Sequence, residues 1–81
     1  MDSLDVTEMR IVITGTFPTL KRAEAVEWIE AHGGIVQASV NKHTDMVIVG
    51  EKAGATKLRG AANLGIDQMD AIEFEDIINA G

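Results

Sequence analysis

A glycine turn directly after an apolar strand is the first place in this sequence where chemistry could occur. Segment 11–17 carries a short β-branched run that ends at Thr14-Gly15, and α/β proteins often bind phosphate at such a strand end. A dinucleotide-binding loop would need G-x-G-x-x-G, and no second or third glycine follows Gly15. A Walker A loop would need G-x-x-x-x-G-K before Ser or Thr, a spacing that residues 50–57 do not have. The turn by itself is a weak signal, and both nucleotide interpretations are disfavoured.

Catalytic constellations are missing from the sequence. There is no cysteine, which removes thiolate zinc sites and cysteine nucleophiles, and there is no G-x-S-x-G elbow. The two histidines, His32 and His43, have no carboxylate partner at a metal-binding spacing. We expect His32, at the end of a predicted helix, to interact with the helix C-terminus rather than with a ligand. The sequence therefore favours a domain that is not an enzyme and that needs no cofactor or metal.

Apolar spacing predicts the elements that must position the glycine turn. Continuous apolar runs bounded by polar residues or glycine predict strands, and helical spacing of apolar residues predicts helices. We expect Gly33-Gly34 to end the first helix, because glycine readily adopts the left-handed conformation found at helix C-termini. Trp28 is expected in the core. Asp70 is expected to cap the last helix. The predicted strands are 9–14, 35–40, 46–49 and 66–69, and the predicted helices are 21–32, 56–64 and 70–78.

This β-α-β-β-α-β-α order indicates an α/β fold. By the right-handed crossover rule, it predicts a mainly parallel four-stranded sheet flanked by three helices that cover both faces.

Length and charge limit the partners of the domain. The 81 residues suffice for one small core, and we expect a loose leader at 1–8 followed by a single domain at 9–81. The net charge is −6, from seven Lys plus Arg against 13 Asp plus Glu, so the overall field repels a polyanion but leaves room for a small local phosphate site. The acidic start is unlike a signal peptide, and no apolar run approaches the roughly 18 residues of a membrane span. We expect a soluble protein with no membrane partner.

Several motifs in order along residues 9–80 resemble the BRCT domain. The chain is most similar to the BRCT domain of bacterial NAD-dependent DNA ligases, and next to that of the clamp-loader large subunit. The resemblance implies a BRCT fold and a module that binds DNA ends, phosphorylated partners or other proteins at replication and repair complexes. It also implies an intracellular location, in the cytoplasm or nucleoid if the source is bacterial. The motifs are Val12–Gly15, Arg22-x-Glu24-Ala25, Gly33-Gly34, Thr44-Asp45 leading into Val47–Val49, and Gly50–Gly54.

The resemblance also implies a phosphate site. Family members that bind phosphate use a hydroxyl and a backbone N–H from the Thr-Gly turn and a lysine at the start of the second helix, which match Thr14, Gly15 and Lys57. The clamp-loader type adds an arginine near the start of the first helix, which matches Arg22. A purely structural interpretation stays open for each: Thr14 could satisfy backbone groups, Gly15 could serve only for its dihedral angles, and Lys57 could be a solvated helix residue.

The leading hypothesis is a non-catalytic module of a DNA ligase or replication factor that binds a DNA 5′-phosphate or backbone phosphate weakly. The alternative is a protein–protein interaction scaffold with a vestigial phosphate pocket. A free-standing enzyme would require an unrecognised site. The oligomeric state is open, with a monomer favoured.

Overall fold

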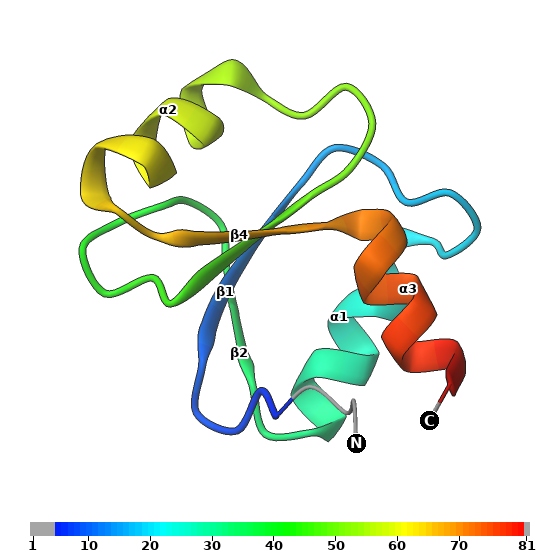
Figure 1. The fold of residues 1–81 in the computed structure, drawn as a ribbon. Helices are drawn as coiled ribbons and strands as arrows, with labels where there is room; N and C mark the ends of the chain where they lie inside the picture. The colour runs from blue at the N-terminus through cyan, green and yellow to red at the C-terminus, as the bar shows by residue number, and fades with distance from the viewer. Residues whose placement is uncertain (1–4, 81) are drawn as a thin grey trace.

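The computed structural model describes residues 5–80 and has an α/β architecture. Its four-stranded sheet is parallel throughout, in the order β2-β1-β3-β4. Figure 1 shows α1 and α3 together on one side of the sheet and α2 on the other. The predicted α/β fold is therefore confirmed. The elements are β1 (Arg10–Thr14), α1 (Arg22–Ala31), β2 (Ile35–Gln37), β3 (Met46–Val49), α2 (Ala55–Leu64), β4 (Asp67–Asp70) and α3 (Ala71–Ala80).

Alternation along the central strands divides the core into two layers. Ile11 and Ile13 of β1 pack in the larger cluster, with side chains of α1 and α3, whereas Val12 packs in a smaller cluster with Ala61 of α2. Successive side chains of a strand point to opposite faces, so a strand with helices on both sides needs apolar residues at every position. The continuous apolar runs of β1 and β3 are the result. The larger cluster is formed by Val6, Ile11, Ile13, Ala25, Ile29, Met46, Ile48, Ala71 and Phe74.

Aromatic residues join the two helices on the larger layer. The fully buried Phe74 of α3 meets Trp28 of α1 edge-on, with ring centroids 5.5 Å apart, and also contacts Phe17. His32 stacks on Trp28, and its Nδ1 lies 2.7 Å from the Trp28 carbonyl oxygen. The prediction that His32 interacts with the end of the first helix is confirmed, and Trp28 packs against the core as expected.

Three strands differ from the predicted bounds. β1 begins at Arg10, one residue later than predicted. β2 ends at Gln37 instead of reaching 40, because Val40 leaves the sheet and packs in the cluster beneath α2. β4 lies one residue later than predicted and extends to Asp70. The Asp70 carboxylate also accepts the Ile72 N–H at 2.8 Å, so this residue caps α3 as predicted.

The predicted leader spans residues 1–8, of which 1–4 lie outside the described residues. Val6 is buried in the core, and Glu8 donates its N–H to the Gly33 carbonyl at 2.8 Å. This part of the leader contacts the end of α1. The division into a leader and a domain stays a prediction. Among residues 5–80, no helix has the length and apolar character needed to cross a membrane.

We expect Phe74→Leu to lower the free energy of unfolding by about 1–2 kcal/mol, because it leaves space between α1, α3 and the sheet. Urea denaturation followed by Trp28 fluorescence measures the change. Ile72→Ala in the same helix is the control, since that side chain is 60% exposed. Equal losses in the two variants would contradict this account of the core.

Candidate phosphate-binding site

The loops that follow β1 and β3 pair with each other at the carboxyl edge of the sheet through an antiparallel bridge. Thr16 and Glu51 exchange two backbone hydrogen bonds, each 2.9 Å long. Gly15 has φ +84°, and a Cβ there would lie 2.5 Å from the Glu51 carbonyl oxygen. Only glycine satisfies both the left-handed backbone and the close approach. The Thr-Gly turn is therefore held against the loop that leads into α2.

Thr14 connects the end of β1 to the start of α2. Its side chain is buried, and its Oγ1 accepts the Gly54 N–H at 2.8 Å. A hydroxyl can accept from one group while donating its own proton to another. The bond to Gly54 therefore holds the Thr14 oxygen in place and leaves its O–H as a donor.

The N-terminus of α2 carries no side-chain cap and no acidic residue in its first turn. The first N–H groups of a helix lack intrahelical acceptors, and the helix dipole adds partial positive charge there. Lys57 lies in this first turn and is partly buried. By contrast, Asp70 and Glu73 place acidic groups at the start of α3. The start of α2 is thus suited to an anion.

Arg22 is the first residue of α1, and its guanidinium reaches the same strand end from the other face. Its Nη1 donates to the Ile13 carbonyl oxygen at 3.0 Å, one residue before Thr14. A guanidinium has five N–H donors, so this single bond leaves others for a ligand. The structure brings Thr14 and Gly15 together with the start of α2, and it places Arg22 beside Ile13. Whether these residues bind phosphate stays a prediction.

A buried carboxylate holds the loop between β1 and α1. Glu75 of α3 accepts the Thr19 hydroxyl at 2.6 Å and the backbone N–H groups of Thr19 and Leu20 at 2.9 Å each. The Thr19 hydroxyl lowers the pKa of Glu75, against the opposing effect of desolvation, and the two N–H groups lower it further. Glu75 therefore holds the loop residues that directly precede Lys21 and Arg22.

Sequence reasoning identified neither Gly54 nor Glu75 as part of this edge. Nothing in the sequence marks Gly54 as the donor to Thr14, because the bond spans 40 positions. Glu75 did leave a signal. It lies on the same helical stripe as the buried Ala71 and Phe74, with Ile78 one turn later, and a carboxylate on an apolar stripe requires buried donors.

The chemistry available at this edge is anion binding. Within the described part of the chain, no group of three or more His, Asp or Glu side chains could hold a metal ion. The donors are a hydroxyl, backbone N–H groups, an ammonium and a guanidinium, a set that suits a phosphate dianion.

Comparison with known proteins finds a family model that covers most of the chain and relatives that are DNA ligases. Residues 3–78 match the family model described as BRCA1 C Terminus (BRCT) domain. The DNA ligase of Ligilactobacillus salivarius (strain UCC118) is 50% identical over 66 residues, and that of Clostridioides difficile (strain 630) is 49% identical over 70 residues. The alignments cover 82% and 86% of this chain but only 10% of each ligase. The chain thus spans about a tenth of the curated relatives it matches.

Gly15→Ala is expected to destabilise the domain by about 2–4 kcal/mol, because it adds a close contact to the strain of a left-handed backbone. Gly65→Ala is the matched control: Gly65 also has positive φ, but a Cβ there would meet nothing within 4 Å. Its cost should be about 1 kcal/mol. Urea denaturation compares the two, and equal costs would argue against the close approach at Gly15.

The hydrogen bonds that the Glu75 carboxylate accepts from Thr19 and Leu20 predict that acid lowers the stability of the domain. Because the folded pKa of Glu75 is lowered, its contribution to stability is complete above the unfolded value of about 4.3 and is lost as the pH falls through the folded pKa. Glu75→Gln should therefore be less stable at pH 7 and should lose less stability than the parent on acidification. Denaturation at several pH values tests this. Glu73→Gln is the control. If stability depended on pH in the same way in Glu75→Gln as in the parent, the proposed role of these hydrogen bonds would be refuted.

Proposed function

The chain belongs to the BRCT family, a family of non-catalytic modules, and we propose that it is the part of a DNA ligase that binds a DNA phosphate. In this proposal the joining reaction is carried out by other domains of the parent protein. The ligand is a 5′-phosphate or a backbone phosphate, bound through Thr14, Gly15, Arg22 and Lys57.

The junction between Thr14 and α2 carries the proposal. The Gly54 N–H binds the Thr14 oxygen, so the Thr14 hydroxyl lies at a helix N-terminus that has no acidic residue in its first turn. Two favourable features then meet at this point, an O–H donor and the positive end of a helix dipole, and Lys57 lies in the first turn of the same helix. A phosphate dianion gains most where several donors act together.

Recognition would proceed by direct hydrogen bonding with no chemical step. The Thr14 hydroxyl and the Gly15 N–H would donate to two phosphate oxygens, and Lys57 would neutralise charge from α2. Arg22 would approach from the α1 side while keeping its bond to the Ile13 carbonyl.

The overall charge of −6 argues for a small site over an extended DNA surface. A polyanion is repelled by most of this surface, so affinity has to come from a few local contacts. A terminal phosphate suits such a site, since it carries more charge than an internal one. We therefore expect weak, salt-sensitive binding that depends on the 5′-phosphate.

NMR titration of the labelled domain with short duplex DNA, with and without a 5′-phosphate, tests the proposal. Phosphate-dependent shifts are expected at Thr14, Gly15, Arg22 and Lys57. Lys57→Met should weaken binding about fivefold and reduce the salt slope by about one.

The matched pair Thr14→Val and Thr14→Ser isolates the hydroxyl. Valine removes the O–H that would donate to phosphate and also the oxygen that accepts the Gly54 N–H. Serine retains both groups, so only serine should preserve binding. Identical responses to phosphorylated and unphosphorylated duplex would refute recognition of the 5′-phosphate and leave only a backbone phosphate as ligand. No shifts at millimolar DNA would refute phosphate recognition of either kind.

A further inference from the structure

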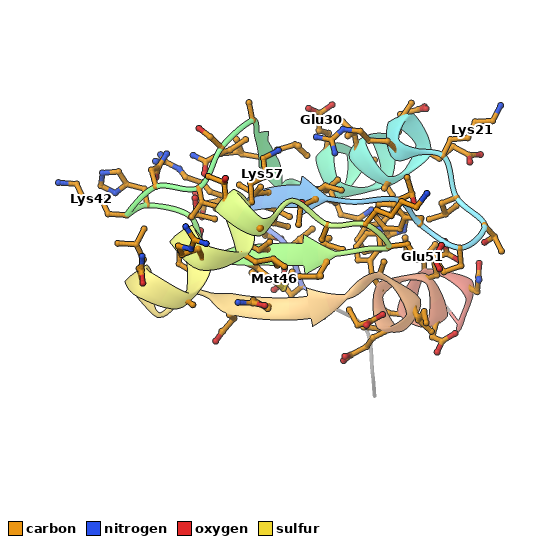
Figure 2. All side chains as sticks on the ribbon, turned by 90° about the horizontal axis from the view of Figure 1, so that it is seen from above. Lys21, Glu30, Lys42, Met46, Glu51 and Lys57 are labelled. Atoms are coloured by element: carbon orange, nitrogen blue, oxygen red, sulfur yellow. The ribbon has the colours of Figure 1, made fainter. Side chains whose placement is uncertain are left out.

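A second surface lies at the same edge of the sheet, on the side of β4. It is a cleft of about 320 Å³ between the loop after β1, the end of β3 and the start of α3. None of Thr14, Gly15, Arg22 and Lys57 lines it. Figure 2 shows Glu51 near the end toward which the strand arrows point, away from Lys57 on α2. The cleft is therefore distinct from the proposed phosphate site. Its lining residues are Thr16, Pro18, Val49, Gly50, Glu51, Asp70, Ala71 and Ile72.

The lining of the cleft combines apolar walls with two carboxylates. Pro18, Val49 and Ala71 supply apolar surface, and Glu51 and Asp70 supply negative charge. No lysine or arginine lines the cleft. This combination matches a long cationic side chain, because arginine and lysine have apolar stems and a charged end. A nucleic-acid phosphate would be repelled by the same carboxylates.

Two neighbouring features favour a segment of protein over a small molecule. Ile72 is 60% exposed at the cleft, which offers a large apolar side chain to a partner residue next to the cationic one. β4 is an edge strand that pairs only with β3 and ends at Asp70 in the cleft. An extended segment running along this edge would reach the cleft directly.

We propose that the cleft between β4, α3 and the loop after β1 docks a basic segment of a partner protein, with one arginine or lysine between Glu51 and Asp70 and an apolar neighbour against Ile72. Charge complementarity carries the choice of partner, since the domain has net charge −6 and the cleft itself is acidic. A second copy of this acidic chain fits the cleft less well for the same reason. The proposal does not depend on phosphate binding.

The direct test is an NMR titration of the labelled domain with a short capped peptide that contains Leu-Arg-Leu in a Gly-Ser background. Shifts should centre on Glu51, Asp70 and Ile72, with half-saturation at roughly 1 mM, as expected for a small contact. Replacing the peptide arginine by glutamate should abolish the shifts, and replacing both leucines by glycine should weaken them. Added NaCl should reduce the affinity.

Domain variants separate the cleft from the rest of the surface. The double variant Glu51→Gln, Asp70→Asn should weaken peptide binding about fivefold, and it should fold because asparagine also caps helices. Glu30→Gln removes one charge on α1 and should leave binding unchanged, as should Lys57→Met in the proposed phosphate site. Loss of phosphate binding therefore leaves the peptide result intact, and the two proposals fail separately.

Several outcomes would overturn the docking proposal. They are equal response to the arginine and glutamate peptides, no shifts at about 5 mM peptide, and equal binding by the double variant and the parent. Cleft shifts produced by duplex DNA or Mg²⁺ but not by the peptide would assign the surface to another ligand. Shifts that depend only on protein concentration would assign it to self-association.

Discussion

The backbone pairing between the loops after β1 and β3 is the constraint on which the carboxyl edge of the sheet depends. The paired N–H and C=O groups of Thr16 and Glu51 join the loops, and the approach leaves no room for a side chain at Gly15. Because the loops are joined there, the chain that leaves β3 enters α2 beside the end of β1, where Gly54 binds Thr14. The proposed phosphate site at the start of α2 depends on that placement.

The paired loops lie between two surfaces that differ in charge. Toward α2 lie hydrogen-bond donors and Lys57, and toward β4 lie Glu51, Asp70 and the exposed Ile72. A domain of net charge −6 can then present a local phosphate site without an extended basic surface. The chain belongs to the BRCT family, and similar segments occur in DNA ligases. The two proposals together describe a module that would bind a DNA phosphate at one place and a protein segment at another.

Where sequence reasoning succeeded, the signal was local or periodic. The run 46–49 became β3 with unchanged bounds, because a strand covered on both faces has to be apolar throughout. Val40 continues the apolar pattern of β2, but it packs under α2. The sequence prediction placed it in the strand because an apolar pattern does not show which element a side chain will contact. Glu75 is one of several acidic residues near the end of the chain, and only its position on the stripe of Phe74 indicates that it is buried.

The sequence by itself determined the element order and the family, and it located the helix ends to within one or two residues. Gly33, with its left-handed backbone, and the helix cap at Asp70 act on residues close to them in the chain. Their effects can therefore be predicted without knowledge of the tertiary structure. The tertiary structure alone decided that Gly54 binds Thr14 and that Glu75 holds the loop before α1. These bonds join residues 40 and about 55 positions apart, and such partners are chosen by how the helices pack on the sheet and not by local preference.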